Sequence, residues 1–558
     1  MSEPKKQNFL QGAALLALSV GIVKVIGAIY KIPLRHIIGD VGFAYFNTAY
    51  NIYSLLLSVA TSGLPLAMSR MISQAHSLGH HNRMRRIYQV ASTIYLSLGL
   101  VCSLIMGIFC HSLANWMGQP DAWAAVLCLA PCALLMGFLS SYRGYFQGQG
   151  NMAPTSISQV LEAICKLVVG LLAALAVKHF TGSIALSAGA AILGVTFSCL
   201  VSVIYLRHKF KPAYHELSVS AEAVDSFRDT TLQLLRIAIP ITIGTAGLQL
   251  LNVLEIGLYM GQLESLLAGG RYLGDLIPAL EEEVKALADY TDAQKYSLMA
   301  SSLKGVYDFS YTIFNMPCAL IAPISTSLLP AVTASLTLNK SQEVRSTEES
   351  AARITGLLAA PCAIGLAVMA EPVMVLLGSY SGEKLVLATQ MMTMMGIMVL
   401  LYALVMLTNV LLQARGRVHV PVIHTLICGS VKLGSLYILT GNPAIGILGV
   451  PISGLLCYLG ILILNLIALR MHGSERSRLL PNLLRPMIPA LIMGVIVYGC
   501  LWALKVPAGI SSSLVLCAVP IAVGVVVYAL CAVFLKVITR EDCLLLPQGE
   551  KIAKLLRL

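Results

Sequence analysis

The sequence predicts an all-α polytopic membrane protein with fourteen transmembrane helices. Of its 558 residues, 57% are hydrophobic and only 11% are charged, and its mean hydropathy of +0.80 lies far outside the range of soluble globular domains. Apolar runs of about 20 residues, the length that an α-helix needs to cross the hydrocarbon core, recur from residue 9 to residue 538. Motifs of the first half also return in the second half, which predicts two six-helix lobes related by an internal repeat and followed by two further helices.

The fourteen apolar runs give the predicted spans. Their approximate limits are 10–34, 43–71, 87–110, 121–146, 155–178, 184–206, 232–260, 303–336, 353–378, 385–413, 420–440, 444–470, 486–505 and 512–538. A transmembrane β-barrel would instead show alternating segments of about ten residues. The first run is too long for the apolar core of a signal peptide, so we expect an uncleaved first span.

The distribution of charge predicts the orientation. With the amino terminus inside, most Lys and Arg residues fall in cytoplasmic loops, as the positive-inside rule requires. The loop 262–302 carries three consecutive glutamates at 281–283 and is expected outside. The net charge of +12 then belongs to inner-face loops that meet anionic lipids, so no nucleic-acid partner is needed to explain it. Both termini are expected in the cytoplasm.

Motifs for metal, cofactor and common enzyme chemistry are missing from the sequence. The fourteen cysteines include no C-x-x-C pair and fall mostly in apolar runs, so we expect reduced, buried thiols and no metal site. The histidine-rich stretch 76–86 is interpreted as a basic loop. No Walker lysine motif, nucleophile elbow or H-E-x-x-H is present, so we expect neither an ATP-driven pump nor an enzyme, and no cofactor.

The internal repeat has a spacing of about 260 residues. The paired segments are VATSGLP (59–65) with ISTSLLP (324–330), ANWMG (114–118) with VMVLLG (373–378), FQGQGNMAPTSIS (146–158) with LQARGRVHVPVIH (412–424), and AILGVTFSC (191–199) with GILGVPISG (446–454). Six helices per repeat is an even number, so both repeats enter the membrane in the same direction. We predict an N-lobe at 1–231, a C-lobe at 232–484 with the acidic external loop, and two last helices with a basic cytoplasmic tail at 485–558.

Three cations interrupt the first apolar run. Each charge at the bilayer centre costs roughly 2.5–3.5 kcal/mol, and steps of 100° per residue place Lys31 and Arg35 within about 20° of Lys24. This stripe must face something polar. Pro33 removes a helical hydrogen bond and predicts a bend between Lys31 and Arg35. Snorkelling to the outer headgroups would explain Lys31 and Arg35 as well, but Lys24 lies too deep for it.

Two groups of polar residues are further candidates for the transport site. Glu162 and Lys166 are four apart in one span, and an ion pair along the helix is the simpler interpretation. Lys166 aligns with Lys432 of the repeat, which has no acid one turn before it. With Glu255, these residues are candidates for coupling or for ion pairs between the lobes.

The second and eighth spans carry the remaining candidates. Lys304 and Asp308 open the eighth span on its outer side. Asn47 and Asn51 on the second span can offer hydrogen bonds to a polar headgroup, although ordinary helix packing explains them equally well.

The segments 45–73 (YFNTAYNIYSLLLSVATSGLPLAMSRMIS) and 144–167 (GYFQGQGNMAPTSISQVLEAICKL), with the EPVMVLLG stretch, resemble the polysaccharide-biosynthesis and stage V sporulation protein B-like exporters. These belong to the superfamily that also contains MurJ-type lipid II flippases, O-antigen flippases and multidrug MATE antiporters. The resemblance implies a fourteen-helix, two-lobe fold in a bacterial plasma membrane. Similar MurJ-type proteins use cations of spans 1, 2 and 8, which Lys24, Lys31, Arg35 and, loosely, Lys304 match. Span 2 departs from the pattern, so Asn47 and Asn51 would contact the headgroup there.

The leading functional hypothesis is a monomeric flippase for an undecaprenyl-pyrophosphate-linked glycan precursor, lipid II or a related polysaccharide unit. A cationic stripe inside a cavity compensates the charge of a pyrophosphate as it crosses the bilayer. Its expected partners are this lipid-linked substrate, membrane lipids and cell-wall synthesis proteins. A MATE-type cation-coupled antiporter is the alternative, although the first span has no carboxylate. A glycan polymerase or transferase acting through the loop 262–302 is a third hypothesis, which the absence of histidine from this loop disfavours.

Overall fold

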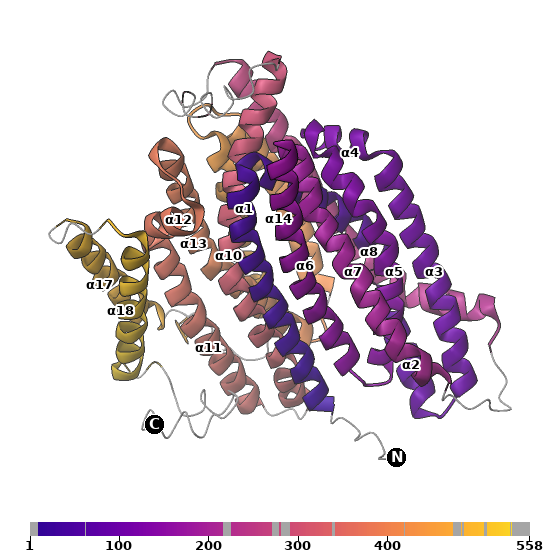
Figure 1. The fold of residues 1–558 in the computed structure, drawn as a ribbon. Helices are drawn as coiled ribbons and strands as arrows, with labels where there is room; N and C mark the ends of the chain where they lie inside the picture. Colours follow the sequence, from indigo (N-terminus) through magenta and orange to yellow (C-terminus); the bar gives the residue numbers. More distant parts are fainter. Residues whose placement is uncertain are drawn as a thin grey trace. The chain divides into compact units, whose positions relative to one another are not determined.

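The computed structural model describes residues 9–61, 63–215, 225–270, 278, 280, 291–337, 341–417, 419–472, 481–482, 485–506, 511–535 and 537. Every regular element in these ranges is a helix (Figure 1). The three glutamates at 281–283 and the basic carboxyl-terminal tail, which the sequence places on opposite sides of the membrane, lie outside the described residues.

The chain divides into two compact units. Unit 1 comprises Met1–Ala268 and Asp289–Asp308, and unit 2 comprises Gly269–Ala288 and Phe309–Leu558. This division groups residues 232–260 with the amino-terminal unit, whereas the repeat in the sequence predicts a lobe boundary near residue 231. The lobe boundaries thus stay a prediction from the sequence.

Unit 1 is built from long helices joined by short turns. They are α1 (Phe9–Thr61), α2 (Leu64–Ser77), α3 (His81–Ile108), α4 (Cys110–Trp116), the 3-10 helix η1 (Pro120–Ala122), α5 (Trp123–Gly148), α6 (Ala153–Thr181), α7 (Ile184–His215), α8 (Phe227–Ala268) and the first part of α10 (Asp292–Thr337). Glycines let several of these helices pack closely. A Cβ atom on Gly194 of α7 would lie 2.3 Å from the Cα atom of Gly170 on α6, so this contact requires small residues on both helices.

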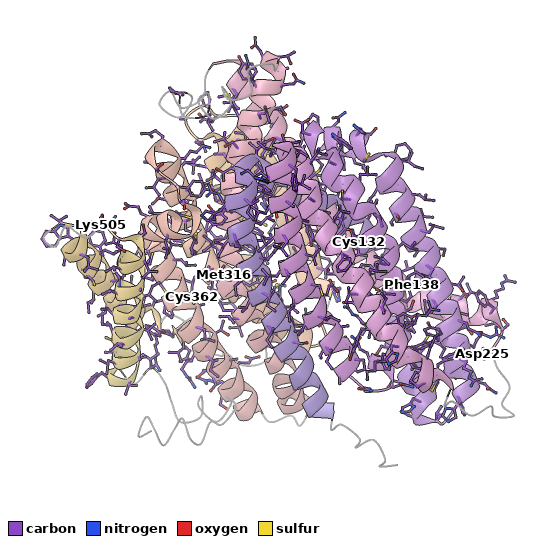
Figure 2. All side chains as sticks on the ribbon, in the orientation of Figure 1. Cys132, Phe138, Asp225, Met316, Cys362 and Lys505 are labelled. Carbon is purple, nitrogen blue, oxygen red and sulfur yellow. The ribbon has the colours of Figure 1, made fainter. Side chains whose placement is uncertain are left out.

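Unit 2 contains the rest of α10 and the remaining helices. They are α11 (Ser341–Val368), α12 (Ala370–Gly378), α13 (Gly382–Ala414), α14 (His419–Thr440), the 3-10 helix η2 (Gly446–Leu448), α15 (Gly449–His472), α17 (Met487–Lys505) and α18 (Ser513–Phe534). Helices α17 and α18 pack side by side, with α17 against α11 and α18 against α12 (Figure 1). In Figure 2, Lys505 marks the end of α17; there its Nζ atom lies 2.7 Å from the Glu371 carboxylate of α12.

Ten helices in the described part of the chain have the length and composition needed to cross a membrane. They are 81–108, 120–148, 153–181, 184–214, 348–368, 382–414, 419–440, 446–471, 487–505 and 513–534. Of the other four predicted spans, 10–34 lies in α1 and 43–71 covers parts of α1 and α2. The spans 232–260 and 303–336 lie in α8 and α10. The chain is therefore a polytopic helical membrane protein, and the count of fourteen spans stays a prediction.

Helix α1 reverses its direction at Gly39. This glycine has φ 71° and ψ −178°, a combination that L-residues avoid. On one continuous helix, residues 31 and 47 would be about 24 Å apart, yet the Lys31 Nζ atom lies 3.1 Å from the Asn47 Oδ1 atom. The two arms of α1 thus form an antiparallel hairpin. Pro33 lies inside the first arm and the change of direction falls at Gly39, so the bend at Pro33 stays a prediction.

The same order of elements occurs in both units. In unit 1 the long helix α3 is followed by the short helix α4 and by Gly118, which has a positive φ, before the long helix α5. In unit 2 the long helix α11 is followed by the short helix α12 and by Ser379, which also has a positive φ, before the long helix α13. The next long helix ends in each case in a turn with a left-handed glycine, Gly150 (φ 77°) and Gly416 (φ 75°). These turns lie within the paired segments 146–158 and 412–424 of the predicted repeat.

Candidate functional site

Lys31 lies at the centre of the polar residues of the α1 hairpin. Its ammonium group donates a hydrogen bond to Asn47 from the opposite arm (3.1 Å) and lies 5.8 Å from the centroid of the Phe43 ring. The Asn47 amide in turn donates to the Phe43 carbonyl oxygen, at 3.0 Å, which fixes its orientation. Within the described residues Lys31 makes no ion pair, and its side chain is half-buried. It is an ammonium group held by neutral partners and still open to a ligand.

Arg35 differs from Lys31, although both lie on the predicted cationic stripe. Its Nε atom donates to Asp40 Oδ1 at 2.8 Å, and both side chains are buried. The reversal at Gly39 makes this contact possible, because it turns Asp40 back toward the end of the first arm. Arg35 therefore has a resident counter-charge in Asp40, and its role in substrate binding stays a prediction.

Lys304 and Asp308 bring α10 into the same cluster. The Lys304 ammonium is fully buried, forms an ion pair with Asp308 one turn later, and donates to the Ala44 carbonyl oxygen of α1 at 3.4 Å. Asp308 is also hydrogen-bonded to the Asn47 side chain and interacts electrostatically with Lys31. The structure thus brings together four predicted site residues, Lys31, Asn47, Lys304 and Asp308, of which Lys31 is the half-buried, unpaired cation.

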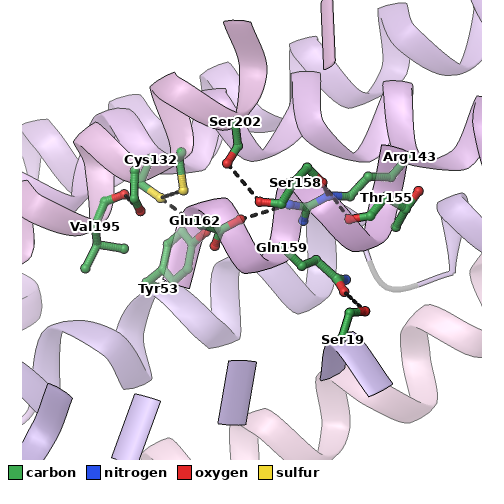
Figure 3. A network of polar contacts seen from close by, with 12 residues as sticks. Ser19, Tyr53, Cys132, Arg143, Thr155, Ser158, Gln159, Glu162, Val195 and Ser202 are labelled. Atoms are coloured by element: carbon green, nitrogen blue, oxygen red, sulfur yellow. Dashed lines mark hydrogen bonds and ion pairs between the residues drawn. The ribbon is translucent and has the colours of Figure 1, made fainter. Parts of the chain in front are cut away.

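Figure 3 shows a second polar network, which involves α1, α5, α6 and α7. The Arg143 Nη2 atom lies 2.9 Å from Glu162 Oε2, and its Nε atom donates to Ser158 Oγ at 3.1 Å. The sequence predicts that Glu162 pairs with Lys166; in the structure the carboxylate binds Arg143 instead. The Lys166 ammonium lies over two aromatic rings, 5.2 Å from the Tyr30 centroid and 4.9 Å from the Tyr50 centroid.

The remaining candidates lie apart from these contacts. Lys24 is exposed and makes no ion pair within the described residues, and Asn51 is half-buried on the second arm of α1. Glu255 is buried on α8, and Lys432 is half-buried on α14 in unit 2; both interact with neighbouring residues. Ion pairs between the lobes stay a prediction.

Sequence reasoning missed Asp40, Arg143 and the two tyrosine rings. The Gly39–Asp40 pair was the available signal for the first, since glycine followed by an acid between two apolar runs is typical of a turn. Arg143 lies near the end of the predicted span 121–146. Its partner lies 19 positions away along the chain, so no helical spacing rule connects them.

Comparison with known proteins decides the family. The model of the polysaccharide biosynthesis protein family matches residues 9–335, which is more than half of the chain. The chain belongs to this family. A second model, of the lipid II flippase MurJ, matches residues 284–519 of the same family member.

Curated relatives from Bacillus subtilis (strain 168) agree with this assignment. The family member is 25% identical to the uncharacterized membrane protein YabM over 99% of the chain and 97% of that protein. It is 24% identical to stage V sporulation protein B over 88% of each chain. It is also 29% identical to the lipid II flippase MurJ, over 36% of the chain and 39% of MurJ.

Solved structures show the same fold. The lipid II flippase MurJ in an inward closed conformation superposes with a TM-score of 0.62 at 12% identity, over 94% of this chain and 99% of MurJ. An inward-facing MATE transporter of the MOP superfamily gives a TM-score of 0.57 at 14% identity, over 83% of this chain and 96% of the other. These likenesses show that the family member has the fold of the MurJ and MATE transport proteins.

Proposed function

We propose that this protein moves an undecaprenyl-pyrophosphate-linked glycan precursor across the bacterial plasma membrane by alternating access. The single observation that carries the proposal is Lys31, a half-buried ammonium held by Asn47 and not neutralised by an ion pair within the described residues. Exposing an uncompensated charge within the bilayer is costly, so an anionic ligand that neutralises it explains why it is there. A phosphate group also accepts the charge-assisted hydrogen bonds that an ammonium donates.

The neighbours of Lys31 suit a lipid-linked substrate. Asn47 offers an amide beside the ammonium, and Lys304 with Asp308 fixes the position of α10 against the hairpin. Lys24 lies seven residues, or about 10 Å, before Lys31 along α1 and is exposed. We assign Lys24 to the approach of the headgroup and Lys31 to its binding, and we expect Asn51 to contact the sugar side of the headgroup.

The architecture required for alternating access follows from the predicted repeat. We infer that the matching element order and the two matching glycine turns, Gly150 and Gly416, mark two six-helix lobes that enter the membrane in the same direction. The remaining helices, α17 and α18, are then two additional helices that follow the C-lobe. Cytoplasmic termini, a monomeric state and contact with cell-wall synthesis proteins complete the proposal.

A MATE-type antiporter shares this fold, so the likeness of the folds does not distinguish the two functions. The carboxylates near Lys31 bear on this choice, because Asp40 and Asp308 form ion pairs with Arg35 and Lys304. The buried carboxylate of Glu255 on α8 also interacts with a neighbouring residue. A cation carrier needs an available acid, whereas the available charge in this cluster is the ammonium of Lys31.

Transport of fluorescent lipid II in proteoliposomes tests the proposal. Purified wild-type protein is expected to expose lipid II carrying a nitrobenzoxadiazole label to dithionite, a reductant that acts on one leaflet, faster than protein-free vesicles do. Lys31→Gln is expected to lower this rate at least about tenfold, since it removes a desolvated charge contact. Lys209→Gln, on an exposed part of α7, serves as the matched control. Wild-type protein that moves neither lipid II nor an undecaprenyl-diphosphate sugar would refute the proposal.

A further inference from the structure

Lys166 is a second ammonium group of unit 1 that makes no ion pair within the described residues. It lies on α6 one turn after Glu162, where an ion pair would be the ordinary outcome. The Glu162 carboxylate is instead bound by Arg143 at 2.9 Å, and Arg143 is anchored further by its bond to Ser158 (Figure 3). Glu162 still interacts electrostatically with Lys166, but its hydrogen-bonded partner is the guanidinium.

The two rings that hold Lys166 come from different arms of the α1 hairpin. Tyr30 lies on the first arm, directly before Lys31, and Tyr50 lies on the second arm. The ring faces attract a cation through their quadrupole, but much more weakly than a carboxylate does at the same burial. An ammonium held in this way can move to an anion without leaving a buried carboxylate unpaired. Lys166 also interacts electrostatically with Lys31, the residue that we assign to headgroup binding.

The charged groups near Lys31 and Lys166 include two ion pairs. The groups that interact electrostatically with Lys31 are Lys166, Asp308 and Lys304. Asp308 is paired with Lys304, and the acid beside Lys166, Glu162, is paired with Arg143. Each of these two pairs is neutral as a unit, so in the described part of the chain the cations of this group without an ion-pair partner are Lys31 and Lys166. They also repel each other, which a shared anion would relieve.

We propose that Lys31 and Lys166 bind the two phosphates of a diphosphate, one ammonium to each, and that Lys166 makes the site selective for diphosphate-linked over monophosphate-linked lipids. The inference rests on the proposed function and adds a specificity-determining residue to it. A diphosphate diester carries one negative charge on each phosphate, which matches the two uncompensated ammonium groups. Both lysine side chains are half-buried, so each has surface that a ligand can reach. A lipid linked to its sugar through a single phosphate is a diester with one negative charge, so it would leave one of the two cations unneutralised.

Binding measurements with two defined lipids test this selectivity. The probes are an undecaprenyl-diphosphate sugar and an undecaprenyl-monophosphate sugar, diesters that carry two charges and one charge respectively. They are added to the full-length protein in detergent micelles, and binding is quantified by native mass spectrometry. The wild-type protein is expected to bind the diphosphate at least about tenfold more tightly, as loss of one charge-assisted contact predicts. Lys166→Gln is expected to bind both lipids with nearly equal affinity, while Lys166→Arg keeps the preference. Lys209→Gln is the control for removal of a surface charge.

Lysine footprinting on the wild-type protein gives a second measurement that needs no variant to fold. The undecaprenyl-diphosphate sugar is expected to protect both Lys31 and Lys166 from acetylation by acetic anhydride, and the undecaprenyl-monophosphate sugar is expected to protect only one of them. A Lys166→Gln protein that keeps the diphosphate preference, or a Lys166 that stays unprotected, would overturn the inference while lipid II transport by the wild type still stands. Failure of the wild type to bind either lipid would instead refute the proposed function and, with it, the role of Lys166.

Discussion

The Arg35 Nε atom lies 2.8 Å from the Asp40 Oδ1 atom across the reversal of α1, and both side chains are buried. This ion pair thus joins the two arms of α1 and neutralises one cation of the site. If the hairpin opened, a guanidinium and a carboxylate would each lose a counter-charge in a poorly solvated place, which is strongly unfavourable. The pair therefore stabilises the turn that brings Lys31 to Asn47.

The first prediction concerns this ion pair. Asp40→Asn is expected to destabilise the protein by about 3–5 kcal/mol, because it leaves Arg35 buried without its counter-charge. The double variant Arg35→Met/Asp40→Leu is expected to lose less than Asp40→Asn alone. The folded fraction after heating in detergent micelles, followed by gel filtration, measures both.

An exposed ion pair in the same unit supplies the control. Arg83 and Asp225 lie 3.4 Å apart with side chains 37% and 41% exposed, so removal of either partner is expected to cost less than about 1 kcal/mol. Equal losses at the two pairs, or strictly additive losses for Arg35 and Asp40, would show that the buried pair does not stabilise the turn.

The second prediction separates backbone strain from steric contact at two glycines. Gly39 has a positive φ but open space around it, so Gly39→Ala is expected to cost about 1–2 kcal/mol from strain alone. Gly305 on α10 is the opposite case, because an added Cβ atom would lie 2.1 Å from the Asp40 carbonyl oxygen. Gly305→Ala is expected to be the more damaging change, since backbone must move to admit it.

Gly27→Ala is the matched control for both substitutions. It lies in the first arm of α1 with no atom within 4 Å of its Cβ position, and alanine favours helix over glycine. Thermal stability should therefore follow the order Gly27→Ala, Gly39→Ala, Gly305→Ala, from most to least stable. If Gly305→Ala proved as stable as the wild-type protein, the close approach of α10 to the turn would be incorrect.

The third prediction uses the two turns of the predicted repeat. Gly150 and Gly416 have φ values of 77° and 75°, and each donates its N–H to a residue three positions earlier, Gln147 or Gln413, at 3.0 and 2.9 Å. Replacement by alanine is expected to cost about 1–2 kcal/mol at either site, because both turns need the same left-handed residue. Protease resistance of each variant, compared with that of Gly434→Ala in a regular helix, measures the effect. A large loss at one turn and none at the other would count against equivalence of the two halves.

Composition and periodicity were sufficient to predict the helical class, because each apolar run of about 20 residues carries its own signal. They also predicted the cations of the cluster, since a Lys or Arg in such a run is conspicuous. They did not predict the partners of these cations. Arg35 forms an ion pair with Asp40 only because the chain reverses at Gly39. Glu162 forms its ion pair with Arg143 of another helix and not with Lys166 of its own helix. A helical projection of a single span contains neither relationship, so the predicted stripe of three equivalent cations became one paired residue and two unpaired ones.

The fourth prediction distinguishes positioning from binding at Lys304. Its ammonium is fully buried, pairs with Asp308 and donates to the Ala44 carbonyl oxygen, so we infer that it holds α10 against α1 and does not touch the headgroup. Lys304→Gln and Asp308→Asn are each expected to lower lipid II transport at least about tenfold, because each leaves the other group buried and unpaired.

Combining the two substitutions decides between the roles. The double variant Lys304→Gln/Asp308→Asn replaces the ion pair by two neutral amides, so it is expected to recover folded protein and transport relative to either single variant. Its affinity for undecaprenyl diphosphate should stay within about threefold of the wild-type value, because the charges that we assign to the phosphates, on Lys31 and Lys166, are unchanged. If the double variant instead loses diphosphate affinity as severely as Lys31→Gln does, Lys304 contacts the substrate directly, and the ion pair seen here must open during the transport cycle to release it.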